Sequence, residues 1–338
     1  MKSKLPTMRD VAKLAGVSQP TVSRVLNQND TTVPISDETR QRVQAAIDAL
    51  GYRPNVVARS LRTQRTQMIA LLIADISNGF YHPLTRAIQD VARQRDYEVL
   101  IANSDHIYEN EKHFCDIVLR RGVDGAIMVP IHLTTAELSH FMEQAQTPVA
   151  VLAEQIDHPQ IDVVYVDDEV ATYEATCWLI AQRGYKTIGF VGVPDYYPPG
   201  PRRRHGFVRA MTDFGLTPDL RFAYAGDFTV EGGKKIAHTL IESGEIPSAL
   251  MVINDLMAIG IMLALQDAGY AVPEEVAVMG FDDIPETQMV RPTLTTIAQN
   301  PRDIGIKLAH LLFDRIENPD ISAKRLTSSC QLIPRQSA

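Results

Sequence analysis

Polar side chains that could read the edges of base pairs are concentrated in the segment DVAKLAGVSQPTVSRVLN, residues 10–27. Glutamine can make paired hydrogen bonds to adenine and arginine to guanine, whereas serine and threonine hydroxyls suit phosphate oxygens better than bases. Valine and alanine side chains recur in the same segment at helical spacing, so the polar side chains would share an exposed face. The candidate DNA contacts on this face are Ser18, Gln19, Pro20, Thr21, Ser23 and Arg24.

Short helices separated by a tight turn must position these side chains. Thr7 and Asp10 form a capping-box pattern that opens a first helix, and Gly16 supplies a turn where a left-handed residue is easiest. Ser18 is suited to cap a second helix, and a third is expected over residues 36–51. This spacing predicts a helix-turn-helix. The alternative is a helical hairpin whose polar face is merely solvated.

The distribution of charge agrees with a nucleic-acid partner for this segment. The whole chain of 338 residues has a net charge of -8. Residues 1–65 contain 11 Lys and Arg against 5 Asp and Glu, so the remaining residues hold 22 against 36. DNA binding requires a local basic surface and not a basic total. Ordinary scatter of surface charge would explain the same numbers without any partner.

The rest of the chain alternates short apolar runs with helical periodicity, which indicates parallel βαβ units. Two sets of about five strands predict an α/β fold with two lobes, each a doubly wound parallel sheet. Open parallel sheets bind ligands at the carboxyl ends of their strands, so a pocket is expected between the lobes. The expected strands cover residues 68–75, 97–103, 124–130, 148–153, 163–168, 187–193, 222–227, 248–254, 276–282 and 294–299.

Residues 10–27, together with YRPNVVARSLRT at 52–63, resemble the lactose/galactose repressor (LacI/GalR) family of bacterial transcription regulators. In that family the second helix reads bases through its first two residues and an arginine, which correspond here to Gln19, Pro20 and Arg24. Pro20 has no side-chain donor or acceptor, which leaves apolar contact with a thymine methyl group.

The resemblance also implies a hinge helix at residues 54–62 that folds when two copies meet over the operator. So short a helix is not stable alone in water. Leu61 matches the family's wedge leucine, which enters the minor groove and bends the duplex. Asn55, Arg59 and Leu61 are the expected DNA contacts of this segment. The alternative for Leu61 is that it covers the body of its own protein.

The βα region resembles the same family's core, which is similar to periplasmic sugar-binding proteins and holds a small effector between its lobes. The match places effector contacts on Arg203 of PRRRHGF, Asn254 of VINDLMAIG and Asp282 of VMGFDD. The adjacent Arg202 and Arg204 are expected to be solvated. Carboxylate, guanidinium and carboxamide groups make paired hydrogen bonds to neighbouring hydroxyls.

Aromatic side chains could stack on the apolar face of a sugar ring. Phe228 suits that role, and Phe80 or Tyr81 suits a second wall, although an aromatic after a strand is as often part of the core. Asp167 is a weaker candidate. The resemblance favours a sugar or sugar derivative, with a purine or another small metabolite as the alternative. The two tyrosines of PDYYPPG would also be able to face the pocket.

The sequence offers no support for an enzyme. It has no G-x-S-x-G elbow, no P-loop and no complete dinucleotide fingerprint, and its histidines lack metal-ligand spacing. No cofactor or metal is therefore expected. No apolar run could span a bilayer and no secretory signal is visible, so we expect a cytoplasmic protein and not an exported sugar receptor. Cys115, Cys177 and Cys330 form no motif and are expected to be structural.

Together these features predict a homodimeric regulator, of the repressor type, that reads a pseudo-palindromic operator under the control of an effector. Residues 1–53 would form the headpiece, 54–66 the hinge and linker, and 67–338 the effector-binding and dimerisation core. Within the core, the expected N-lobe covers about 67–166 and 299–327, and the C-lobe about 167–298 and 328–338. After the last amphipathic helix, residues 301–316, no heptad repeat is expected to build a tetramer.

Overall fold

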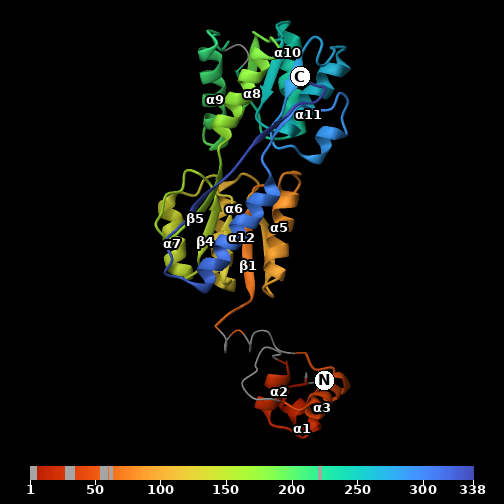
Figure 1. Cartoon of the computed structure of the whole chain (residues 1–338), viewed down its shortest axis with the longest axis vertical. Coiled ribbons are helices and arrows are strands. Elements are labelled where there is room, and N and C mark those ends of the chain that lie inside the picture. Colours follow the sequence, from red (N-terminus) through yellow and green to blue (C-terminus); the bar gives the residue numbers. More distant parts are fainter. Residues whose placement is uncertain (1–5, 27–34, 54–59, 61–63, 220–222) are drawn as a thin grey trace. The chain divides into compact units, whose positions relative to one another are not determined.

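A computed structural model describes residues 6–26, 35–53, 60, 64–219 and 223–338. The chain divides into two compact units, Met1–Thr66 and Gln67–Ala338 (Figure 1). None of the helices in the described part is long and apolar enough to cross a membrane.

The first unit is a small helical bundle built on local capping signals. Its helices are α1 (Met8–Ala15), α2 (Gln19–Leu26) and α3 (Asp37–Leu50). Thr7 and Asp10 form the expected capping box, and Gly16 ends α1 in the left-handed conformation with φ of 66°. Valine and alanine side chains from the three helices pack into one core, which includes Val11, Val22 and Val43. The expected helix-turn-helix is therefore confirmed.

The N-lobe of the second unit contains a six-stranded parallel sheet in the order β11-β5-β4-β3-β1-β2. Alternate residues of β1 point to opposite faces, where Leu71 packs with α5 and α12 and Leu72 packs with α6 and α7. The elements of this lobe are β1 (Met68–Ile73), α5 (Tyr81–Arg93), β2 (Glu98–Asn103), α6 (Tyr108–Arg121), β3 (Gly125–Met128), α7 (Thr135–Ala145), β4 (Val149–Leu152), β5 (Asp162–Val166), α12 (Pro301–Glu317) and β11 (Arg325–Ser328).

The C-lobe contains a four-stranded parallel sheet in the order β7-β6-β8-β9. Figure 1 shows α8 beside α9, and α10 beside α11. Gly206 permits the close approach of α9 to α8, because a Cβ atom there would lie 2.2 Å from the carbonyl oxygen of Glu169. The elements are α8 (Asp168–Ala181), β6 (Ile188–Gly192), α9 (Pro199–Asp213), β7 (Ala223–Ala225), α10 (Val230–Ser243), β8 (Ala249–Val252), α11 (Asp255–Asp267), β9 (Ala277–Met279), the 3-10 helix η2 (Pro285–Gln288), β10 (Thr296–Ala298) and β12 (Gln331–Ile333).

All ten expected strands are present, and the two-lobed α/β fold is confirmed. Two further strands, β11 and β12, were not predicted. β11 joins the edge of the first sheet beside β5, and β12 pairs antiparallel with β10. The described chain thus passes between the lobes after β5, after β10 and after β11. These connections bring the carboxyl ends of both sheets toward the same space.

Candidate functional site

Helix α2 presents the predicted DNA-reading side chains on its outer face. Ser18, Gln19 and Pro20 are exposed, whereas Val22 and Val25 are buried in the bundle. Thr21, Ser23 and Arg24 are partly exposed. The Ser18 hydroxyl also accepts a hydrogen bond from the backbone N–H of Thr21 at 3.3 Å, which caps the helix. The remaining predicted DNA contacts, Asn55, Arg59 and Leu61, lie outside the described residues.

A cavity of about 140 Å³ lies between the two lobes of the second unit and is lined by side chains from both. Its position at the carboxyl ends of the strands is the usual ligand position in open parallel sheets. Asp167 does not line it: this side chain caps α8 by accepting a hydrogen bond from the N–H of Val170 at 3.3 Å. Its neighbour Asp168 lines the cavity instead. The other six predicted effector contacts all line the cavity: Phe80, Tyr81, Arg203, Phe228, Asn254 and Asp282.

Charged and amide side chains form the C-lobe side of the cavity. Arg203 is buried; its Nε lies 3.1 Å from Asp168 Oδ2, its Nη1 donates to the carbonyl of Ile253, and its guanidinium lies 3.5 Å from the centroid of the Phe281 ring. These contacts fix the guanidinium before any ligand arrives. Asn254 caps α11 and donates through Nδ2 to the carbonyl of Phe228 at 2.9 Å, which holds that aromatic residue in place.

Two buried carboxyls occupy the same side. Burial raises the pKa of Asp282 to about 7, against the lowering effect of Arg203 and of the Gln299 amide, whose Nε2 donates to Oδ1 at 2.5 Å. Burial, followed by the charge of Asp282, raises the pKa of Asp255 to about 8. Asp255 does not line the cavity; it accepts from Thr296 Oγ1 at 2.5 Å and from the N–H of Ile284 at 2.9 Å. Asp282 therefore titrates near neutral pH at the cavity surface.

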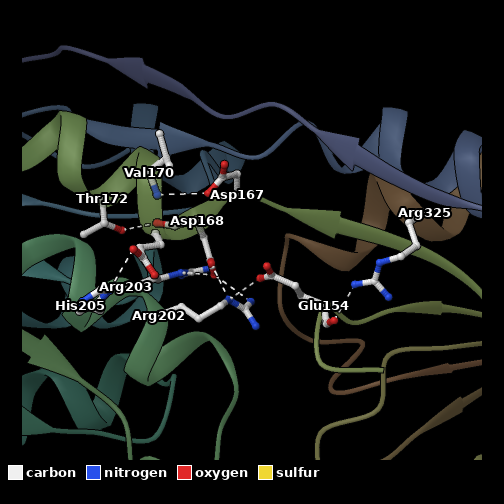
Figure 2. Close-up of polar contacts among 10 residues, drawn as sticks. Glu154, Asp167, Asp168, Val170, Thr172, Arg202, Arg203, His205 and Arg325 are labelled. Carbon is white, nitrogen blue, oxygen red and sulfur yellow. Dashed lines mark hydrogen bonds and ion pairs between the residues drawn. The ribbon is translucent and has the colours of Figure 1, made fainter. Parts of the chain in front are cut away.

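Arg202 differs from the sequence expectation, because it is not simply solvated. Its Nε and Nη2 donate to the two oxygens of Asp168 at 2.8 and 3.1 Å, and its Nε also lies 3.3 Å from Glu154 Oε2 (Figure 2). Glu154 follows β4 in the N-lobe, and its backbone carbonyl is held by Arg325. The ion pair therefore joins the lobes. Arg204 is half exposed and pairs with the exposed Asp195, as a solvated side chain would.

Aromatic rings from both lobes also line the cavity. His106 of the N-lobe stacks on Phe228 of the C-lobe with centroids 5.1 Å apart, and Tyr197 meets both rings edge-on. Tyr197 is thus one tyrosine of PDYYPPG that faces the cavity, whereas Tyr196 is 60% exposed and does not line it. Phe80 and Tyr81 pack edge-to-face, and burial followed by the charge of Asp282 raises the pKa of Tyr81.

Three of the lining residues have backbone conformations that side-chain-bearing residues rarely adopt. The φ angles are +58° at His106, +67° at Phe228 and +121° at Asp282. Positive φ is uncommon for residues other than glycine and is a marked outlier for a bulky aromatic. Such conformations persist only where surrounding structure enforces them, and they cluster at ligand-binding sites. The backbone therefore points to the same cavity as the side chains.

Several lining residues were missed by sequence reasoning. A usable signal existed, since most of them directly follow strands: His106 comes soon after β2, Glu154 after β4, Asp168 after β5 and Gln299 after β10. Arg202 carries no comparable signal, because three consecutive arginines on α9 look alike in the sequence.

Comparisons with known proteins agree with both units. Residues 7–55 match the family described as bacterial regulatory proteins, lacI family, and residues 179–338 match the periplasmic binding protein-like domain. Catabolite control protein A of Priestia megaterium is 38% identical over 90% of this chain and 91% of its own length.

Two solved structures extend this similarity. The Lac repressor dimer bound to operator and the anti-inducer ONPF has a TM-score of 0.85 at 26% identity, covering 99% of each chain. A LacI family transcriptional regulator from Enterococcus faecium with bound ribose has a TM-score of 0.72 at 29% identity, covering 80% of this chain and 98% of that one.

Proposed function

This chain belongs to the lacI family of bacterial regulatory proteins, and we propose that the effector bound between its lobes is a monosaccharide or a monosaccharide derivative. The chain is accordingly a DNA-binding transcriptional regulator with a helix-turn-helix headpiece and an effector-binding core, and family members such as the Lac repressor bind operator DNA as dimers. We assign operator contacts to the exposed face of α2, with Gln19 and Arg24 as base-reading side chains, and to Asn55, Arg59 and Leu61 of the hinge segment.

The arrangement of polar and aromatic groups around the cavity carries the proposal. A sugar ring presents hydroxyls at its edge and carbon-bound hydrogens on its faces. Among the lining side chains, Arg203, Asp282 and Gln299 offer paired donors and acceptors, and Phe228 with Tyr197 offers apolar ring surface. A few convergent polar groups in a largely aromatic concavity suit a small polyhydroxy ligand.

The size of the cavity suits a small ligand. An apolar cavity of about 150 Å³ accommodates benzene, and the cavity here measures about 140 Å³. His106 and Phe228 are also in direct stacking contact at 5.1 Å, so a flat base cannot lie between them without separating the lobes. The bound ribose in the related regulator from Enterococcus faecium supports the same ligand class.

Regulation then follows from a shift between lobe arrangements. A ligand that contacts both lobes favours the arrangement to which it binds more tightly. It can change operator affinity only by as much as its own affinities for the two arrangements differ. We place this chain among the repressors of the family, in which the effector sets how tightly a dimer holds a pseudo-palindromic operator.

A thermal-shift screen of the full-length protein tests the ligand class. The panel comprises D-ribose, D-glucose, D-galactose, cellobiose, adenine, hypoxanthine, adenosine and cytidine. Binding to the folded state raises its melting temperature, and we expect at least one monosaccharide to do so. Phe228→Ala should raise the dissociation constant for that monosaccharide about tenfold or less, and so reduce the thermal shift, since an aromatic contact contributes about 0.5–1.5 kcal/mol.

Phe214→Ala is the matched control, because Phe214 is a half-exposed phenylalanine at the end of α9 and does not line the cavity. Its response should equal that of the parent. Stabilisation by nucleobases or nucleosides without any response to monosaccharides would overturn the proposal in favour of a purine-type effector. A thermal shift of the same size in Phe228→Ala as in the parent protein would exclude Phe228 as part of the ligand site.

A further inference from the structure

Arg335, which follows β12, is held against the turn that carries Asp282. Its Nη2 lies 2.6 Å from Asp283 Oδ1, and its side chain is only 14% exposed. Its Nη1 donates to Thr287 Oγ1 at 3.0 Å and to the carbonyl of Leu294 at 2.9 Å. Neither Arg335 nor Asp283 lines the cavity. The ion pair therefore links the segment after β12 to the residue that directly follows a cavity-lining carboxyl.

The backbone that carries Arg335 is itself held in place. The N–H of Arg335 donates to Thr295 Oγ1 at 2.9 Å. Ser337 is buried, and its hydroxyl donates to the carbonyl of Val278 in β9 at 2.6 Å and accepts from the N–H of Thr295 at 2.8 Å. The N–H of Val278 in turn donates to the carbonyl of Ser337 at 2.8 Å. The guanidinium of Arg335 is thus presented to the turn from a fixed segment and not from a free tail.

The turn has a backbone that needs such support. The φ angles are +121° at Asp282 and +59° at Asp283, so two consecutive residues other than glycine have positive φ. Conformations of this kind persist only where surrounding contacts enforce them. The N–H of Asp282 donates to the carbonyl of Ile297 at 2.8 Å, and its carboxyl accepts from Gln299. Those contacts hold the first residue of the pair, and Arg335 holds the second.

From these contacts we infer that Arg335 is a positioning residue for effector binding, which acts through Asp283 to hold the turn in the conformation that presents the Asp282 carboxyl to the cavity. This inference rests on the proposed effector site. A carboxylate contributes its hydrogen bonds to a ligand only from the correct position, and residues behind a binding group supply that precision. A turn that is held before the ligand arrives also avoids the entropic cost of ordering it on binding.

Two substitutions break the ion pair, one from each end. Arg335→Gln removes the positive charge. Asp283→Asn keeps the shape of the side chain and tolerates the φ of +59°, because asparagine adopts this conformation readily. Each should raise the dissociation constant of the effector about tenfold. The double variant should bind no more weakly than either single variant, because both substitutions remove the same contact.

A conservative variant and a matched control accompany these two. Arg335→Lys keeps a positive charge opposite Asp283, and its dissociation constant should stay within about threefold of the parent. Arg291→Gln is the control, because Arg291 is exposed in the same lobe and donates to the backbone carbonyls of Gln288 and Val290. Its affinity for the effector should equal that of the parent.

The decisive measurement repeats Arg335→Gln in the Asp282→Asn background. The full-length proteins are titrated by calorimetry at pH 8 with the monosaccharide that gives the largest thermal shift. Arg335→Gln should raise the dissociation constant about tenfold in the parent and about threefold or less in Asp282→Asn, because a neutral amide makes a weaker hydrogen bond whose loss costs less. The same measurement with Asp283→Asn decides the question if Arg335→Gln does not fold.

A merely structural role for Arg335 would give a different pattern. It would weaken binding by the same factor in both backgrounds, since the effect would not pass through the Asp282 carboxylate, and that result would overturn the inference. Parent-like affinity in both Arg335→Gln and Asp283→Asn would overturn it too.

The same variants distinguish this inference from the proposed function. If adenosine or cytidine binds in place of a sugar and Arg335→Gln weakens it more in the parent than in Asp282→Asn, the ligand class is wrong and the positioning role stands. If a monosaccharide binds and the two backgrounds respond alike, the ligand class stands and the inference is wrong. If neither class binds the parent protein, both are overturned.

Discussion

Asp282 should make the affinity for a sugar effector depend on pH. Its pKa is raised to about 7, chiefly by burial, so roughly one tenth of the molecules carry the ionised carboxylate at pH 6 and roughly nine tenths at pH 8. Sugar hydroxyls donate hydrogen bonds, and an ionised carboxylate accepts them more strongly than a protonated one. The binding-competent fraction therefore grows about tenfold across this range, and the dissociation constant should fall by about the same factor.

Calorimetric titration of the full-length protein with the monosaccharide that gives the largest thermal shift, at pH 6, 7 and 8, measures this change. Asp282→Asn keeps the shape of the side chain and cannot titrate, so its affinity should be lower at pH 8 and independent of pH. Asp255→Asn is the control, because Asp255 has a raised pKa of about 8 and does not line the cavity. That variant should retain the tenfold rise in affinity between pH 6 and pH 8.

The sign of the effect is the critical result. Affinity that falls as pH rises would mean that the protonated carboxyl is the form that binds, with Asp282 acting as a donor. A tenfold rise that persists in Asp282→Asn would assign the titration to another group. Either result would refute the reasoning from the raised pKa of Asp282 to its role as an acceptor.

Two further predictions concern the headpiece and the division of the chain. Arg24→Ala should abolish discrimination between operator and random duplex, while weak, salt-sensitive binding remains because phosphate contacts carry no sequence information. Mobility-shift assays measure this discrimination, and a variant that retains it would exclude Arg24 as a base-reading residue. Removal of residues 1–66 should leave a core, residues 67–338, that unfolds cooperatively and binds the same sugar with unchanged affinity. Calorimetry measures the unfolding transition and the affinity, and loss of a cooperative transition would reject this domain boundary.

Local signals allowed much of the fold to be predicted from the sequence. Gly16 and Ser36 act through backbone geometry within a few residues, so their effects do not depend on the rest of the protein. The ten predicted strands were similarly visible as apolar runs. β11 was not, because its sequence RLTS is mostly polar and it becomes a strand only by pairing with β5, more than 150 residues earlier. Strand formation at a sheet edge depends on the partner as much as on propensity.

The same distinction explains which parts of the cavity could be predicted. Asn254 and Asp282 lie just beyond strand ends of the C-lobe, where a rule about parallel sheets applies. Arg203 lies within α9, and the resemblance to the family was its signal. The lobe-spanning contacts follow no such rule. Arg202 and Arg204 are two residues apart on α9, yet one meets Asp168 and Glu154 while the other meets the exposed Asp195.

Only the packed structure distinguishes these arginines, because Glu154 belongs to the other lobe and lies 48 positions before Arg202 in the sequence. Asp168 contacts both arginines. One of its oxygens accepts from Arg203, which lines the cavity, and both of its oxygens accept from Arg202, which also pairs with Glu154 of the other lobe. Any ligand that moves Arg203 must therefore disturb a carboxylate that also holds the contact between the lobes. The pairing of Arg202 with Asp168 and Glu154 is a tertiary contact, so local sequence does not reveal it.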